Sequence, residues 1–167
     1  MVQIDAYKLL LVSQKTILTM VEDVPDEAWF TPLPGMDVSF DWILGHYAAV
    51  EDWFLHHLNG VAYELPPEWQ KTYWADTSGP VTPETGVGRT GVTAGFTETR
   101  QRLLTALKFD ILHFNRFVKK GFFPGNVKFR GDAWLFVSAH AYWHIGELNC
   151  LRRIAGLPYS GTKGIHH

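Results

Sequence analysis

Histidines are the residues of this sequence whose spacing most clearly suggests chemistry. His140 and His144 are four residues apart in a segment expected to be helical. Their side chains therefore differ in direction by about 40° and in height by about 6 Å, so both rings could bind one ion, as in helical zinc sites. Phe136, Val137 and Leu148 share this face, which predicts that it is buried. Each buried ring needs a partner, which could be a metal ion, a carbonyl or a hydroxyl.

A third histidine, His46, lies among apolar residues near the start of an earlier helix. A polar residue there could face the middle of the last helix, and three histidines from two helices would leave a fourth coordination position open. An open position is typical of a catalytic metal site rather than a structural one. His57 faces nearly the same way but lies about 16 Å further along the helix, too far to bind the same ion. We expect His56 to form a surface pair with Asp52, and His113 to be exposed or structural.

The elements that must position these side chains are helices. Apolar residues recur at helical spacing over four segments, and Ser39 and Gly60 are suitable cap and stop residues for the second. Asp5 and Asp132 are expected to cap the first and last segments, and Pro25 to stop the first. The predicted helices span residues 5–23, 40–59, 90–107 and 132–155.

The connections between these segments differ in length. Residues 61–91 are rich in Pro, Gly and Thr and predict a long packed loop, while residues 108–131 predict irregular structure with room for a short helix near 111–117. The predicted fold is all-α, a four-helix bundle with one or two long connections, in which sites are built from inward-facing side chains. We expect one domain over residues 1–160 and a tail over 161–167, whose His166 and His167 are excluded as a tag remnant.

Composition excludes several classes of protein. The chain has 167 residues, of which 46% are apolar, so it is not a disordered chain. Fifteen Lys and Arg against seventeen Asp and Glu give a net charge of −2 with no run of basic residues, which argues against nucleic-acid binding. A single cysteine, Cys150, excludes an internal disulfide and Cys-based metal sites, and we expect it to be buried. No secretory signal and no membrane span is recognisable, so we expect a cytoplasmic protein.

The last helix resembles that of the DinB/YfiT-like family, which shows an H-x-x-x-H-x-G-Q-L pattern. The matching segment is Ala139-His140-Ala141-Tyr142-Trp143-His144-Ile145-Gly146-Glu147-Leu148, and Leu151-Arg152 and Gly156-Leu157-Pro158 follow it. Upstream, Pro25-Asp26-Glu27-Ala28-Trp29 precedes a Pro-Gly loop, and Ser39 opens the helix that bears His46 and Glu51. The resemblance covers most of the chain but is weak over residues 61–131. Glu147 stands where the family more often has Gln, which adds a carboxylate near the site.

The resemblance implies a four-helix bundle, usually a homodimer, that holds a divalent metal ion (zinc or nickel). The family's three histidine ligands correspond to His46, His140 and His144. Relatives include transferases that use low-molecular-weight thiols such as bacillithiol or mycothiol, and mycothiol-dependent isomerases. Many other members have no known activity.

The leading hypothesis is a transferase in which the metal activates a thiol that attacks an electrophilic small molecule. Glu51, Glu147 and Tyr47 are candidate catalytic residues that would orient ligands or handle protons. Aromatic side chains are expected to line the site: Trp53, Trp69, Trp74 and Trp143.

Two alternatives stay open at this point. The metal could activate water instead of a thiol, which would make the protein a hydrolase. The chain could also be a non-catalytic metal-binding or sensing module, with Glu147 or Glu51 as a fourth ligand that closes the site. A ferritin-like di-iron site would need paired Glu-x-x-His motifs, and haem attachment would need Cys-x-x-Cys-His; the chain has neither.

Overall fold

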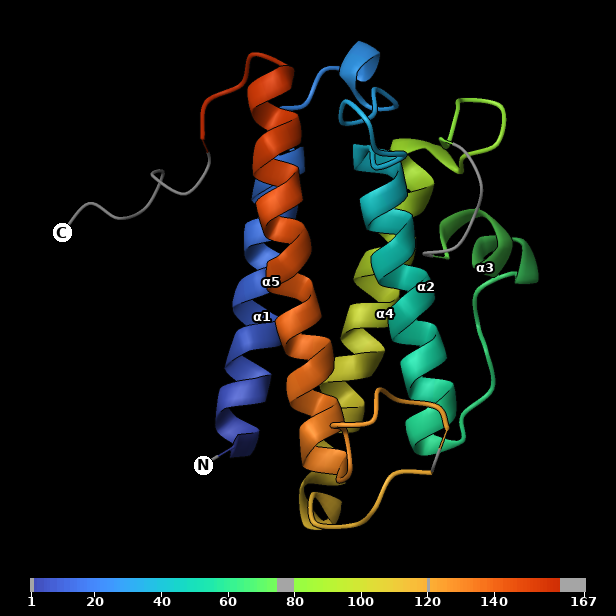
Figure 1. Cartoon of the computed structure of the whole chain (residues 1–167), viewed down its shortest axis with the longest axis vertical. Helices are drawn as coiled ribbons and strands as arrows, with labels where there is room; N and C mark the ends of the chain where they lie inside the picture. Colours follow the sequence, from blue (N-terminus) through green and yellow to red (C-terminus); the bar gives the residue numbers. More distant parts are fainter. Residues whose placement is uncertain (1, 75–79, 120, 160–167) are drawn as a thin grey trace, which may run out of the picture.

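Helices make up the regular structure of the computed structural model, which describes residues 2–74, 80–119 and 121–159 (Figure 1). The only β-structure in these ranges is an isolated antiparallel bridge between Phe117 and Phe129. In chain order the elements are α1 (Val2–Val21), the 3-10 turn η1 (Asp26–Ala28), α2 (Phe40–Asn59), α3 (Pro67–Tyr73), α4 (Gly88–Asp110), the 3-10 turn η2 (Ile111–His113) and α5 (Arg130–Ile154).

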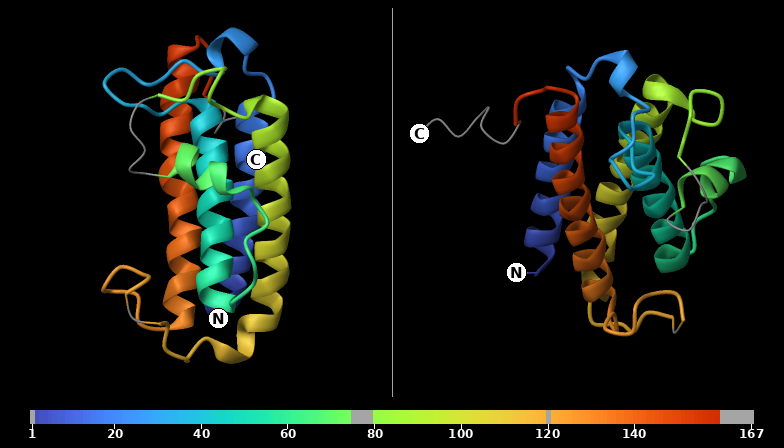
Figure 2. Two further views of the ribbon diagram at one scale, coloured as in Figure 1. Left: turned by 90° about the vertical axis from the view of Figure 1, so that its right-hand side faces the viewer. Right: turned by 45° about the horizontal axis from the view of Figure 1, so that its top comes forward.

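The four long helices run side by side as a bundle, which confirms the predicted all-α fold (Figures 1 and 2). Helix α2 packs chiefly on α4, and α1 chiefly on α5, while α2 also contacts α5 across the bundle. Their apolar faces form two buried clusters. One surrounds Leu44, Tyr47 and Phe96, and the other surrounds Phe54, Leu103 and Trp134. None of the described helices is long and apolar enough to cross a membrane.

Helix α2, which bears His46, has the ends that its sequence predicts. The Ser39 hydroxyl accepts a hydrogen bond from the Trp42 amide at 3.2 Å, which satisfies one of the free N–H groups of the first turn. Gly60 ends the helix with φ of 72°, a left-handed conformation that favours glycine. These two residues fix the register of α2 and therefore the height of His46 in the bundle.

The ends of the other helices differ from the prediction. Helix α1 begins at Val2, so Asp5 lies inside it and is not its N-cap. Helix α5 begins at Arg130, and the Asp132 carboxylate accepts hydrogen bonds from the amides of Lys128 and Phe129, 3.1 and 3.0 Å away. Asp132 thus stabilises the first turn from inside the helix. Helix α4 is longer than predicted at both ends.

The long connection expected over residues 61–91 contains a helix, α3, which begins with Pro67 at a position where its missing N–H costs nothing. Over residues 111–117 the short helix is confined to the turn η2. Cys150 lies on the outer face of α5 and is exposed, which corrects the expectation that it is buried. The tail 161–167 lies outside the described residues.

Helix α3 docks on α2 through a glycine. A β-carbon on Gly45 would lie 2.3 Å from the ring of Tyr73, the last residue of α3, so only glycine allows this approach. The Tyr73 hydroxyl then donates to the Asp41 carboxylate at 2.7 Å and accepts from the Val87 amide at 2.7 Å. Tyr73 therefore joins α3 to the start of α2 and to the segment before α4.

Gly45→Ala should lower the free energy of unfolding by about 1–3 kcal/mol, because the added methyl group must displace the Tyr73 ring. The matched control is Gly146→Ala in α5, where a β-carbon would meet no atom within 4 Å. There alanine should stabilise the helix by about 0.5–1 kcal/mol. Urea denaturation of both variants measures the difference, and equal stabilities would contradict the close approach of α3.

Candidate metal centre

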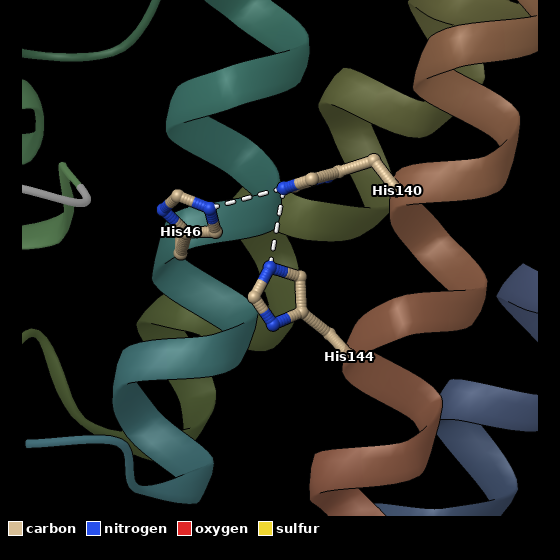
Figure 3. A group of neighbouring side chains, drawn as sticks. All are labelled: His46, His140 and His144. Atoms are coloured by element: carbon tan, nitrogen blue, oxygen red, sulfur yellow. Dashed lines mark hydrogen bonds between the residues drawn. The ribbon is translucent and has the colours of Figure 1, made fainter. Parts of the chain in front are cut away.

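Three histidine rings converge between α2 and α5 (Figure 3). The Nε2 atom of His140 lies 3.2 Å from Nε2 of His46 and 3.1 Å from Nε2 of His144. One ligand atom from each residue lies within 4.8 Å of the other two, and this is the one group of this kind among the described residues. The structure therefore brings together the three residues that the sequence predicted as ligands, and together they could hold a metal ion.

Hydrogen bonds on the far side of two rings decide which nitrogen carries the proton. The Nδ1 atom of His46 lies 2.7 Å from the Tyr73 carbonyl oxygen, which can only accept, so Nδ1–H of His46 donates to it. The Nδ1 atom of His144 lies 2.5 Å from a carboxylate oxygen of Glu147 and donates to it in the same way. Both rings consequently present the lone pair of Nε2 to the centre of the cluster, the form that binds a metal.

These lone pairs cannot all be satisfied by hydrogen bonds. His140 can place at most one proton on its Nε2, so at most one of its two short contacts can be a hydrogen bond. A cation satisfies all three at once. Two nitrogens that bind one tetrahedral zinc ion at 2.0–2.1 Å are about 3.3 Å apart, close to the separations here. The donor set and its spacing fit a divalent ion.

Burial keeps two of the rings neutral. Desolvation, followed by the electrostatic effect of His144, lowers the pKa of His46 to about 4 and that of His140 to about 3. A metal must compete with protons for histidine nitrogens, so these lowered pKa values favour ligation at neutral pH. His46 and His144 are buried, whereas His140 is half-buried and is the most accessible of the three.

Glu147 acts on the cluster through His144. One carboxylate oxygen accepts from His144, and the other accepts from the Trp143 indole N–H at 3.3 Å. Partial burial raises the pKa of Glu147, but the hydrogen bonds and the electrostatic effect of His144 outweigh burial and lower this pKa below its usual value. An ionised carboxylate behind a histidine ligand fixes the ring and makes its free nitrogen more basic.

Glu51 and Tyr47, the other two candidate catalytic residues, each bind a partner other than the three histidines. Arg100 of α4 forms a buried ion pair with one oxygen of Glu51 and also donates to the Leu10 carbonyl at 2.7 Å. The other oxygen of Glu51 is buried with no hydrogen-bond partner among the described residues. Burial raises the pKa of Glu51 despite the attraction of Arg100.

Tyr47 packs its ring edge-on against those of His140 and His144, with centroids 6.1 and 5.4 Å away. Its hydroxyl donates to the Ala141 carbonyl at 2.6 Å. Burial raises the pKa of Tyr47 well above its ordinary value, so the hydroxyl keeps its proton at neutral pH. Tyr47 thus fixes α5 to α2 beside the ligands.

Two groups that contact the histidine ligands were not predicted from the sequence. Trp42 stacks on the His46 ring with centroids 4.5 Å apart and planes 9° apart, and its edge contacts His144. Its position one turn before His46 was the signal that could have identified it. The Tyr73 carbonyl carried no such signal, because any residue supplies a carbonyl.

The tryptophans expected around the site are dispersed. Trp143 is 74% exposed and reaches His144 only through Glu147. Trp69 is buried against Tyr73, with ring centroids 5.4 Å apart. Trp53 stacks on His57 and contacts Trp74, which places both rings outside the three-histidine cluster.

The other histidines also lie outside it. The expected surface pair of Asp52 and His56 is wrong, because Asp52 is buried and accepts a hydrogen bond from Arg102 at 2.8 Å, while His56 donates to the Val61 carbonyl. His57 donates to the carbonyl of Trp53, one turn earlier in α2. His113 is half-buried in the turn η2.

No described carboxylate or thiol completes the group of three histidines. Glu147 and Glu51, the two residues considered as a fourth ligand, bind His144 and Arg100 instead. Among the described residues the site is therefore a set of three ligands that leaves at least one coordination position for another molecule. Such a set is typical of catalytic metal sites.

Removal of one ligand should abolish most metal binding. In protein freed of the terminal histidines, His144→Ala should weaken affinity for zinc by more than about 100-fold, the upper range for loss of an outer-shell partner. His57→Ala is the matched control and should bind as the parent does. Elemental analysis after dialysis measures the metal content, and a chelator should lower the melting temperature of the parent but not that of His144→Ala. Equal metal content in the parent and His144→Ala would refute the site.

The metal-free protein should lose stability as the pH falls from about 6.5 to 4. In this window the unfolded chain protonates His46 and His140, while the folded chain keeps them neutral because its pKa values are about 4 and about 3. The unfolded state then binds more protons, and the free energy of unfolding should fall by at least about 2 kcal/mol. Urea denaturation with a chelator present measures this loss. His46→Gln/His140→Gln should show a shallower loss, and an equally steep one would contradict buried neutral rings.

The comparison with curated proteins finds no match for the chain. The family model of the DinB superfamily matches residues 9–148, a range that includes α2, α4 and all three histidines of the cluster. Because this match covers well over half of the sequence and the bundle and histidines agree with it, the chain belongs to the DinB superfamily.

Proposed function

We propose that this protein is a metal-dependent transferase that joins a low-molecular-weight thiol to an electrophilic small molecule. The observation that supports this most is the set of three histidine nitrogens with no fourth ligand from the described residues. A closed set of four ligands would have favoured a structural or sensing role, whereas an open set leaves room for a reactant.

A divalent ion at this site, zinc or nickel, would supply a positive charge that lowers the pKa of a thiol to make it a thiolate at neutral pH. The thiolate then forms a sulfur–carbon bond with the electrophile, the leaving group departs with the electron pair of its bond, and the thiol proton passes to solvent. An isomerase would use the same thiol and release it at the end of the reaction.

The chain's own residues would hold the ligands in place. The Tyr73 carbonyl and the Glu147 carboxylate keep the protons of His46 and His144 on Nδ1. Trp42 lies flat against His46 and restricts the rotation of its ring. Reactants would approach from the side of His140, the most accessible of the three histidines.

Tyr47 and Glu51 belong to the proposal as positioning residues. The Tyr47 hydroxyl, bound to the Ala141 carbonyl, would set the distance between α2 and α5. Glu51 and Arg100 would hold α2 against α4 beneath the ligands. Glu147 is the candidate with the most direct effect on reactivity, since it contacts a ligand.

The remaining parts of the proposal have separate grounds. A homodimer rests on the resemblance to characterised relatives. A cytoplasmic location agrees with thiol chemistry, since thiols are kept reduced there. A small-molecule substrate is favoured over nucleic acid because the sequence has no run of basic residues.

The proposal predicts consumption of an electrophile only when metal and thiol are both present. Zinc- or nickel-loaded protein would be mixed with 1-chloro-2,4-dinitrobenzene and bacillithiol, mycothiol or cysteine, and chloride release followed. His140→Gln should abolish turnover, since the amide cannot replace the imidazole. Glu147→Gln should reduce it by about 10-fold to 100-fold through weaker metal affinity and ligand basicity, and excess metal should restore only the part due to affinity.

The control is His57→Gln, which leaves the three-histidine cluster intact and should react as the parent does. Equal turnover without thiol, on this or an ester substrate, would replace the proposal with a hydrolase. Metal binding without turnover of any substrate in a broad panel would favour a binding or sensing module.

A further inference from the structure

The charges of this chain are separated along the bundle. Residues 108–130 contain six of the fifteen lysines and arginines but only one of the seventeen acidic residues, Asp110. Residues 22–37, which connect α1 to α2, contain five acidic residues and no lysine or arginine. These two connections lie at opposite ends of the molecule (Figure 1). The net charge of −2 therefore conceals a basic connection at one end and an acidic connection at the other.

The basic end also exposes apolar side chains. Leu112, Phe109 and Phe117 are 81%, 77% and 76% exposed, which makes them the three most exposed large apolar residues of the described chain. Scattered single apolar residues on a surface are ordinary, but three that protrude from one end of a bundle mark an interaction surface.

Backbone contacts order the connection that bears Phe117. The Val118 amide donates to the Lys128 carbonyl at 3.0 Å and the Arg130 amide to the Arg116 carbonyl at 2.9 Å, so the two limbs of the connection between η2 and α5 are joined. The Phe117 and Phe129 rings pack with centroids 4.8 Å apart. We call this surface the basic apolar end; its members are Lys108, Phe109, Leu112, His113, Arg116, Phe117, Lys119, Lys128 and Phe129.

The cations of this surface are available to a partner. Lys108, Arg116, Lys119 and Lys128 are exposed, and none has an ion pair within the part of the chain that the structure describes. Arg116 and His113 line a cavity of about 340 Å³ together with Phe109. The Nδ1 atom of His113 is buried and has no hydrogen-bond partner among the described residues. Arg130 and Asp110, which form an ion pair, also line the cavity. A phosphate oxygen that enters the cavity could accept from the exposed Arg116.

We propose that the basic apolar end docks on the surface of an anionic phospholipid bilayer. Protruding apolar side chains would enter the boundary between headgroups and acyl chains, and the surrounding lysines and arginines would contact lipid phosphates. Leu112, the most exposed of the three, separates this occupant from nucleic acid, because an aliphatic side chain gains from hydrocarbon but has no stacking face for a base.

The opposite end strengthens this assignment. Two of its five acidic residues, Asp23 and Asp26, form ion pairs with Arg152 and Arg89. The other three are repelled by an anionic surface while the basic end is attracted, so the charge distribution favours an orientation with the basic end toward the membrane. His140 lies ten residues into α5 from its start at the basic end, about 15 Å along the axis. Docking therefore leaves the histidine cluster clear of the bilayer, and this inference is independent of the proposed reaction.

Co-sedimentation with vesicles tests the proposal. At low ionic strength the intact protein should bind vesicles that contain about one quarter phosphatidylglycerol in phosphatidylcholine, and binding should fall as salt is added. Vesicles of phosphatidylcholine alone should bind far less. Phe109→Ser/Leu112→Ser should weaken binding about tenfold or more, and Lys119→Glu/Lys128→Glu about 25-fold or more, at about fivefold for each lost cation.

Two controls match these changes elsewhere on the surface. Val12→Ser in α1 removes a side chain that is 55% exposed, and Lys71→Glu in α3 reverses an exposed lysine. Both should bind vesicles as the parent does, and circular dichroism should confirm that all four variants are folded. No binding at low salt, or equal binding by parent and end variants, would overturn the proposal. Binding of a single-stranded oligonucleotide in place of vesicles would also overturn it. The same holds if an end variant converts a dimer into monomers while its binding to vesicles stays unchanged.

Discussion

Repulsion among three imidazole lone pairs is the constraint on which the centre of this bundle depends. The Nε2 atoms face one another at 3.1 and 3.2 Å in a buried setting, where unpaired polar atoms are costly. His46 and His144 cannot relieve this repulsion by moving a proton to Nε2, because Tyr73 and Glu147 hold their protons on Nδ1. A positive charge between the rings would satisfy all three Nε2 atoms at once. Burial of His46 and His140 opposes their protonation, which leaves a metal ion as the charge that fits.

Helix α3 connects this constraint on the histidine rings to the packing of the fold. Its last residue supplies the carbonyl that orients His46, and the ring of that residue lies where a β-carbon on Gly45 would be. The Tyr73 hydroxyl is in turn held by Asp41, which also accepts from the Trp29 indole at 2.8 Å. Changes in this outer layer should therefore alter the metal site without touching a ligand, because the tautomer of His46 depends on them.

The sequence was sufficient for the fold class and for the three ligands, because helical spacing fixes both. The spacing of four positions from His140 to His144 places two rings on one face wherever the helix begins, so the error of two residues at the start of α5 did no harm. The ion-pair partners of buried charged residues could not be predicted from the sequence. Nothing local connects Glu51 to Arg100, 49 residues away, or turns Asp52 from His56 toward Arg102. The place of Cys150 was also missed, since an apolar side chain beside a buried stripe can face either way.

The distribution of charge over the molecule could not be predicted from the net charge alone. A net charge of −2 and the lack of a basic run suggested a surface without preference, yet the fold places a basic connection at one end of the bundle and an acidic connection at the other. The connection between α1 and α2 and the connection between α4 and α5 each lie at one end of the bundle, so the composition of each contributes to that end (Figure 1). Helices α2 and α4 begin at the same end, so the connection that contains α3 passes along the side of the bundle instead. The connection between α4 and α5 is basic and apolar and the one between α1 and α2 is acidic. The ligands lie between them on α2 and α5, so the ends can differ in charge without disturbing the chemistry of the centre.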